Sequence, residues 1–277
     1  MILPRYPIYI PTKGRALKHA PTIRMLQRDQ VPFRIVIEAP EIEQYARLVN
    51  RDQILVLPFR DHPLALAETR TWIKAHATES GAQRHWQLDD NLYHFFRVWK
   101  GQRPRCRAGV AMAVIEDFTD RYENIAISGP NYEMFTIPGP ELPPFFLNVH
   151  VYSCSLILNS LPYRWRSKFN DDTDYCLQAL AGGWCTVLVN AFPVKKAPTM
   201  TSRGGNTEMY QGDGRLKMAR SLELQWPGVV SVARRFHRPQ HVIKDSWKKF
   251  DTPLKRRADV PLDLPPNDYG LVLVDRR

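Results

Sequence analysis

Two acidic clusters in this chain have the residue types that metal-assisted group transfer requires. The first is the triplet Asp89-Asp90-Asn91, and the second is Asp171-Asp172-x-Asp174. Adjacent hard oxygen donors suit Mg²⁺ or Mn²⁺, and such an ion can stabilise charge that grows on a departing diphosphate. A separate carboxylate can act as a general base that takes a proton from an acceptor hydroxyl. The two clusters together therefore indicate metal-assisted transfer with a distinct base.

Each cluster also has a purely structural interpretation. Asp and Asn are common in the turn that ends a strand, and acidic residues in the first turn of a helix interact favourably with its dipole. The first triplet alone does not distinguish a metal site from a turn, and helix capping alone explains one or two acids of the second cluster. The surrounding elements must therefore be considered.

The first half of the chain alternates short apolar runs with helical stretches, which is the pattern of an α/β domain with a mostly parallel central sheet flanked by helices. We expect strands at residues 8–10, 34–38, 54–57 and 85–88, and an amphipathic helix at 64–77. Polar groups follow three of these strands, namely Pro11 to Arg15, Glu38, and the first acidic triplet. Ligands bind at the carboxyl ends of strands in open α/β sheets, so these groups are expected to line one pocket.

The later part of the chain predicts a second region. A long apolar run at 149–159 precedes the second acidic cluster, which opens a helix that ends at Gly182-Gly183. Strand character returns at 186–189, and a helical stretch at 216–226 leads into a basic region. We therefore divide the chain into a catalytic domain at 1–195 and a basic C-terminal extension at 196–277. The extension is expected to be partly helical, to pack on the catalytic domain and to contact the acceptor.

The overall composition is that of an ordinary globular protein, with 44% hydrophobic and 24% charged residues among 277. The first seven residues are too short and too rich in proline for a signal peptide, and no apolar run is long enough to span a membrane. We therefore expect a cytoplasmic protein, in the host cytoplasm if it is phage-encoded. The four cysteines form no Cys-x-x-Cys pair, so neither a zinc ribbon nor a disulfide framework is expected.

The charge balance indicates a polyanionic partner such as nucleic acid, because the net charge is +11 and the pI is near 9.6. No acidic residue interrupts the basic run at 97–107. The segment 234–257 contains nine Lys or Arg residues and only two Asp residues. An ordinary solvated surface is the alternative interpretation of both runs. The candidate nucleic-acid-binding residues are Arg103, Arg105, Arg203, Arg234, Arg235, Lys248 and Lys249.

Residues 8–192 resemble the GT-A glycosyltransferases, whose central sheet is Rossmann-like. The segment Tyr9 to Arg15 looks like the first strand and loop of that family, which cradles the nucleotide. Leu88-Asp89-Asp90-Asn91 resembles its Asp-x-Asp motif, with Asn91 where aspartate is usual. Ala67-Glu68-Thr69-Arg70 is similar to the helix that carries an arginine near the diphosphate, and residues 169–177 resemble the acidic start of the acceptor-side helix.

The resemblance implies a role for each of these residues. The donor would be a nucleoside diphosphate sugar, commonly a UDP-sugar, and the acceptor-side base would be Asp172, with Asp171 the next candidate. The motif Asp89, Asp90 and Asn91 would hold Mn²⁺ or Mg²⁺, with the direct ligand left open. The donor-binding residues would be Pro11, Thr12, Lys13, Arg15, Glu38, Arg70 and Asp89.

Within that family, the chain is most similar to phage glycosyltransferases associated with TET-like base hydroxylases. The glycine loop at 201–206, Trp226-Pro227 and the basic tail prompt this comparison. It implies transfer to a hydroxymethylated base in DNA, such as 5-hydroxymethylcytosine. One alternative is an enzyme that acts on a polysaccharide, lipid or protein, and another is a non-catalytic nucleic-acid-binding protein on a degenerate transferase fold. Neither a membrane nor an obligate protein partner is expected.

Overall fold

The structure is a computed structural model that describes residues 2–16, 20–139, 141–197, 212–235, 237–243 and 245–261. Within these residues, a ten-stranded sheet has the order β3-β2-β1-β4-β9-β7-β10-β5-β6, and β8 pairs with β10. The strands are β1 (Ile8–Pro11), β2 (Arg34–Ile37), β3 (Ile54–Val56), β4 (Arg84–Leu88), β5 (Leu92–Phe96), β6 (Arg105–Cys106), β7 (Ile125–Tyr132), β8 (Phe145–Leu147), β9 (Cys154–Leu158) and β10 (Cys185–Lys196).

The sheet is mixed, and its first half is parallel. Strands β3, β2, β1 and β4 run parallel to one another, and β7 runs parallel to β10. Strand β9 is antiparallel to both β4 and β7, and every one of its residues is buried. The predicted α/β, Rossmann-like class is confirmed. The apolar run at 149–159 did not reveal the direction of β9, because that direction is set by its pairing with β4 and β7.

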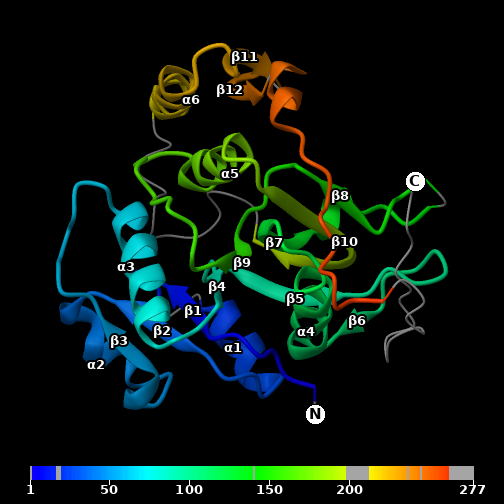
Figure 1. Ribbon diagram of the computed structural model, residues 1–277. Helices are drawn as coiled ribbons and strands as arrows, with labels where there is room; N and C mark the ends of the chain where they lie inside the picture. Colours follow the sequence, from blue (N-terminus) through cyan, green and yellow to red (C-terminus); the bar gives the residue numbers. More distant parts are fainter. Residues whose placement is uncertain are drawn as a thin grey trace.

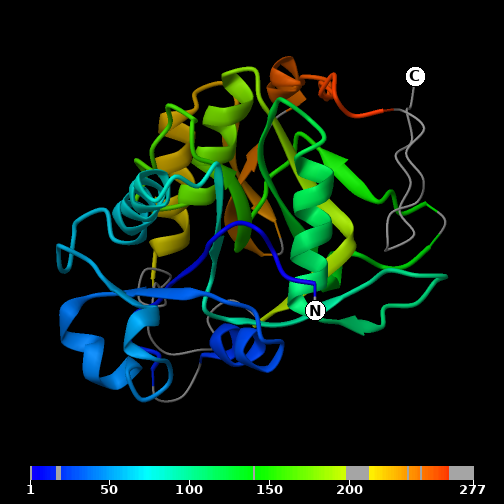
Figure 2. The same cartoon turned by 60° about the horizontal axis from the view of Figure 1, so that its bottom comes forward.

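Helices cover both faces of the sheet (Figures 1 and 2). The helices α1 (Pro21–Arg28) and α4 (Ala108–Thr119) share one core with Ile8 and Ile10 of β1. Tyr9 lies on the opposite face and packs with Ile73 of α3 (Leu66–Glu79). This alternation follows from the pleat of a strand, whose successive side chains point to opposite faces. The helix α5 (Asp171–Ala181) covers the same face as α3, over β7 and β10.

Short helices connect several of these elements. The segments η1 (Ala39–Glu41), α2 (Ile42–Tyr45) and η2 (Arg51–Gln53) lie between β2 and β3, and η3 (Glu133–Phe135) directly follows β7. No helix in the part of the chain that the structure describes is both long and apolar enough to cross a membrane.

The C-terminal part of the described chain packs on α5 (Figure 1). It comprises α6 (Gly214–Gln225), the hairpin of β11 (Val230–Arg235) and β12 (Arg238–Ile243), and η5 (Asp245–Phe250). Leu177 of α5 shares a small core with Leu222 and Val230, and Trp226 Nε1 donates a hydrogen bond to Asp174 Oδ1 at 2.8 Å. These contacts seat the extension on the acidic helix. The division of the chain at residue 195 stays a prediction, and β10 runs one residue beyond it.

Candidate active site

A cavity of about 1050 Å³ lies where the sheet, α5 and the C-terminal part meet. Both acidic clusters face it, because Asp89, Asp171 and Asp172 all belong to its lining. Further walls come from α3, from the end of β10, from the segment around η3, from α6 and from β12, which contributes Arg238 and His241. The cavity therefore joins residues that are far apart in the sequence.

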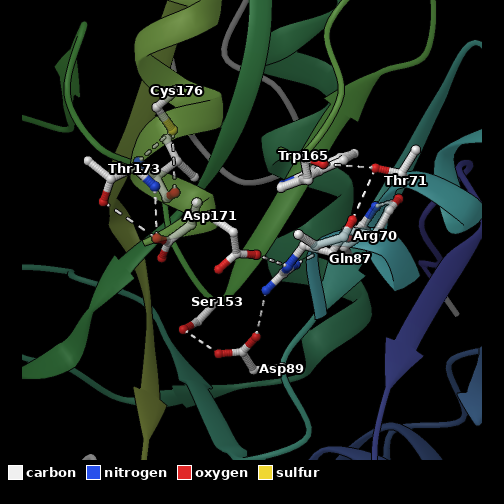
Figure 3. A network of polar contacts seen from close by, with 12 residues as sticks. Arg70, Thr71, Gln87, Asp89, Ser153, Trp165, Asp171, Thr173 and Cys176 are labelled. Atoms are coloured by element: carbon white, nitrogen blue, oxygen red, sulfur yellow. Dashed lines mark hydrogen bonds and ion pairs between the residues drawn. The ribbon is translucent and has the colours of Figure 1, made fainter. Parts of the chain in front are cut away.

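Arg70 links the two acidic clusters (Figure 3). Its Nη2 donates to Asp89 Oδ1 at 3.1 Å, and its Nε lies 2.9 Å from Asp171 Oδ2. The side chain is only 7% exposed, so these ion pairs form with little access to water. Burial lowers the pKa of Arg70, but the carboxylates of Asp171 and Asp89 outweigh it and raise the pKa overall. The arginine thus remains charged and holds the two carboxylates together.

A chain of buried polar groups fixes the orientation of Arg70. Its Nη1 donates to Gln87 Oε1 at 3.1 Å, and Gln87 Nε2 donates back to the Arg70 carbonyl at 3.1 Å and to His85 Nε2 at 2.8 Å. His85 Nδ1 lies 2.5 Å from Asn159 Oδ1. Since Gln87 donates to Nε2, the imidazole is neutral with its proton on Nδ1. Burial lowers the pKa of His85 to about 4, which maintains this neutral form.

Asp89 is held from the opposite side by Lys196, at the end of β10. Lys196 Nζ lies 2.8 Å from Asp89 Oδ2, and Ser153 Oγ donates to the same oxygen at 2.7 Å. Burial favours a raised pKa for Asp89, yet Lys196 and Arg70 more than compensate and lower it. Asp89 is therefore ionised and carries a cation on each of its two oxygens.

Asp90 points into different surroundings from Asp89. Thr12 Oγ1 donates to Asp90 Oδ2 at 2.7 Å, and Arg15 forms an ion pair with Asp90 Oδ1. The side chain is almost fully buried, and this burial raises the pKa of Asp90 despite the neighbouring Arg15. Asp89 thus contacts residues at the cavity, whereas its neighbour Asp90 contacts residues of the loop after β1.

The loop after β1 brings several predicted donor residues together outside the cavity lining. Pro11 is the last residue of β1, and Lys13 Nζ lies 2.8 Å from Glu38 Oε1 and 2.7 Å from Asp61 Oδ1. Neither Pro11 to Arg15 nor Glu38 lines the cavity that contains Asp89. The expected single pocket is therefore two adjoining groups, which meet at the peptide between Asp89 and Asp90.

The two acids at the start of α5 have different environments. Burial and the neighbouring carboxylates raise the pKa of Asp171 to about 6, although Arg70 opposes this shift. Asp172 Oδ2 lies 3.3 Å from His150 Nε2, and its backbone neighbour Thr173 donates an N–H to Asp172 Oδ1 at 2.8 Å. Burial opposes ionisation of Asp172, but His150 outweighs it and lowers its pKa. Asp172 is about one-third exposed at the cavity, so a bound hydroxyl can reach it.

The residues of the first acidic triplet fit a divalent cation only in part. Among the described residues, no group of three His, Cys, Asp or Glu side chains is placed to hold a metal ion. Asn91 Oδ1 is buried without a hydrogen-bond partner in this part of the chain, and Asp89 faces the cavity. Asn91 does not belong to the cavity lining, and both oxygens of Asp89 are already paired with Arg70 and Lys196. Asp90 is likewise occupied by Arg15 and Thr12, so Mg²⁺ or Mn²⁺ reaches a carboxylate of this motif only if Arg70 or Lys196 moves to a bound diphosphate.

The predicted nucleic-acid-binding residues fall at several places. Arg103 donates to the backbone carbonyls of Glu133 and Thr136, so its guanidinium is partly engaged within the protein. Arg105 is exposed on β6, Arg234 and Arg235 are exposed at the end of β11, and Lys248 and Lys249 are exposed in η5. Arg203 lies outside the described residues.

The sequence interpretation missed several residues of the cavity. His150 stands within the long apolar run, and Lys196 ends β10, which extends seven residues beyond the strand expected at 186–189. A polar residue within an apolar run is the signal that could have drawn attention to His150. His241 and Arg238 belong to β12, for which the sequence indicated only a basic region.

The chain matches a known protein family. Residues 6–205 match the family described as TET-Associated Glycosyltransferase, a span that covers well over half of the 277 residues. No curated protein matches the chain. The matched span contains Asp89, Asp171, Asp172, Arg70 and Lys196, and it ends before α6 and the β11–β12 hairpin.

Proposed function

We propose a reaction from the premise that the chain belongs to the TET-associated glycosyltransferase family. It is therefore a glycosyltransferase, and its family implies a modified DNA base as the acceptor. A sugar passes from a nucleoside diphosphate sugar, first of all a UDP-sugar, to the hydroxyl of 5-hydroxymethylcytosine in DNA. The observation that carries this proposal is the shared cavity, in which Arg70 joins Asp89 of one acidic cluster to Asp171 of the other.

The donor spans the two groups of residues around the Asp89–Asp90 peptide. Its nucleoside binds at the loop after β1, near Lys13 and Glu38, and its diphosphate lies in the cavity beside Lys196 and Arg70. Two cations at one end of a cavity suit the double negative charge of a diphosphate. If Arg70 and Lys196 turn from Asp89 to the diphosphate, Asp89 would become available to Mn²⁺ or Mg²⁺, which would neutralise charge on the leaving diphosphate.

The acceptor hydroxyl approaches from the α5 side. Asp172 takes its proton while the oxygen forms a bond to the anomeric carbon, and the bond from that carbon to the diphosphate breaks. The carboxylate of Asp172 is exposed at the cavity, whereas that of Asp171 is paired with Arg70, so Asp172 is the acid that an acceptor hydroxyl can reach. His150 holds the carboxylate from the other side and so orients it.

Mass spectrometry of an oligonucleotide tests this function. The protein is incubated with Mn²⁺, a panel of nucleotide sugars and duplexes that contain either 5-hydroxymethylcytosine or cytosine. We expect the mass to rise by one sugar on the hydroxymethylated duplex alone, and the gain to disappear with Asp172→Asn but not with the surface control Asp259→Asn. Absence of any gain on hydroxymethylated DNA would contradict the acceptor, and full activity in EDTA would contradict the metal.

A further inference from the structure

A row of exposed apolar side chains follows β7 in and just after η3. Met134, Phe135 and Ile137 are 67%, 59% and 75% exposed, although these residue types usually lie inside proteins. Grouped apolar side chains at a protein surface often mark a binding surface. We call Met134, Phe135 and Ile137 the apolar lip.

The apolar lip lies at the edge of the catalytic cavity. Met134 and Phe135 belong to the cavity lining, together with the preceding Tyr132. Tyr132 OH lies 2.5 Å from Ser153 Oγ, which in turn donates to Asp89. A molecule seated on the lip is therefore next to the cavity in which the proposed transfer takes place.

A basic hairpin adjoins the lip. It is formed by β5 and β6, and its tip is closed by two backbone hydrogen bonds between Trp99 and Gln102 at 2.9 and 3.0 Å. Lys100 and Gly101 both have positive φ, as a tight two-residue hairpin turn requires. Trp99 is 46% exposed, with Arg97 packed over its ring at 4.3 Å from the centroid. Arg103 connects this hairpin to the lip through the Glu133 and Thr136 carbonyls.

A second basic hairpin contributes to the cavity from the C-terminal part. In β11 and β12, Arg235 lies directly opposite Arg238, and no acidic residue occurs between Val230 and Ile243. Like charges opposite one another in a hairpin are unfavourable unless an anion lies between or beside them. Arg238 also belongs to the cavity lining. The β11–β12 hairpin thus brings positive charge to the cavity itself, whereas the β5–β6 hairpin reaches only the segment that carries the apolar lip, through Arg103.

We propose that the apolar lip enters the base stack of duplex DNA and fills the gap left by the target base when that base rotates into the cavity. The two basic hairpins bind the phosphates of the DNA on either side. Enzymes that act on a base take it out of the stack, and proteins that open a base step often insert apolar side chains there. Phosphate neutralisation supplies the affinity. This inference rests on the proposed DNA acceptor and adds how the duplex is opened.

The double variant Met134→Ala/Phe135→Ala tests the lip, with Val56→Ala as the matched control. Val56 is 39% exposed on β3, at the opposite edge of the sheet from the β5–β6 hairpin. The measured quantity is kcat/KM for a paired duplex divided by kcat/KM for the same modified base in a single strand. Base stacking on an aromatic side chain is commonly worth about tenfold or more in affinity, so we expect this ratio to fall about tenfold in the lip variant.

A second readout follows base opening directly. 2-Aminopurine beside the target base becomes more fluorescent when its stacking is lost, and we expect the unaltered protein and the Val56→Ala control to produce this signal. The lip variant should lose most of it, and Ile137→Ala, which alters a highly exposed residue, should weaken it. The inference would be overturned if the lip variant kept both the ratio of the two kcat/KM values and the 2-aminopurine fluorescence of the unaltered protein. It would also be overturned if kcat/KM fell by the same factor on the duplex and on the single strand. Absence of transfer by the unaltered protein to any acceptor would instead count against the proposed function.

Discussion

Single residues at the cavity act through charges that neutralise one another. Arg70 and Lys196 lie on either side of Asp89, and Asp171 balances Arg70 at its other end. Removing one partner leaves the other buried and uncompensated, which is more costly than removing both. The same arrangement prepares the site for a diphosphate, because the cations are already in place before the substrate arrives.

Lys196→Met tests this role of Lys196. We expect the transfer rate to fall by about 10²- to 10³-fold, as when one preorganised donor for a developing negative charge is lost, and Lys196→Arg to recover part of it. Steady-state kinetics with saturating donor measures the effect. Lys255→Met is the control, because the ion pair between Lys255 and Glu123 is exposed to water, unlike the pair between Lys196 and Asp89. A Lys196→Met rate within twofold of the unaltered enzyme would refute the role.

His85 makes the stability of the fold depend on pH. Its pKa is lowered from 6.5 to about 4 by burial, so between these values the unfolded chain binds more protons than the native one. The contribution of His85 to the free energy of unfolding therefore falls as the pH drops from 6.5 towards 4, by about 2 kcal/mol at pH 5. The raised pKa of Asp171 acts in the opposite direction over this range, so the His85 contribution is measured as the difference between the unaltered protein and His85→Gln in denaturant unfolding at pH 7.5 and pH 5. His85→Gln should remove this contribution, whereas His237→Asn at an exposed position should leave it intact.

At the scale of elements, α5 serves both the cavity and the C-terminal part. Its first turn presents Asp171 and Asp172 to the cavity, while Asp174 accepts a hydrogen bond from Trp226 and an ion pair from Arg166. All three acids lie in the first helical turn, where they interact favourably with the helix dipole, although the N-cap residue Asn170 makes no side-chain capping hydrogen bond. Asp174 links the extension to the fold, and the other two acids remain available for chemistry.

Leu222→Ala should loosen the attachment of α6 to α5. Leu222 is fully buried in the small core that it shares with Leu177, so its truncation should cost about 2 to 5 kcal/mol. We expect faster amide hydrogen exchange in α6, β11 and β12 and little change in β1 to β4, because the damaged core lies beyond the main sheet. The control is Leu224→Ala, two residues further on and 82% exposed. Equal exchange in the two variants would contradict the attachment.

At the scale of the whole molecule, positive charge predominates, with 39 Lys and Arg residues against 28 Asp and Glu. The described part of the chain places some of this excess on the β5–β6 hairpin and on the β11–β12 hairpin, the second of which lines the cavity. Long-range attraction to a polyanion accelerates association and depends strongly on salt. The fold as a whole therefore suits an acceptor that carries many phosphates.

Arg234→Gln/Arg235→Gln should reduce the salt dependence of DNA binding. Each phosphate contact contributes about 0.9 to the slope of log K against log salt concentration, so loss of two contacts should lower the slope by about 2. Fluorescence anisotropy over a salt series measures it. Arg47→Gln/Arg51→Gln, between α2 and β3 at the far edge of the sheet, should leave the slope unchanged. A slope equal to that of the unaltered protein would show that Arg234 and Arg235 do not contact phosphates.

The sequence by itself determined the α/β class, most of the strands and helices that carry the acidic clusters, and the placement of those clusters at a strand end and a helix start. Hydrophobic periodicity and capping preferences are local, so they can be read from neighbouring residues. The sequence did not predict the antiparallel direction of β9 or the β5–β6 hairpin, because strand pairing depends on residues elsewhere in the chain.

Only the tertiary structure decided which side chains meet. Asp89 and Asp90 are neighbours in sequence yet point into different groups, and Lys196 reaches Asp89 across 107 positions. The pairing of β10 with β5, which begins directly after Asn91, brings Lys196 close to Asp89 without any local signal, since such contacts depend on long-range packing. For the same reason, the sequence showed Met134 and Phe135 only as apolar residues, and the fold placed them at the edge of the cavity.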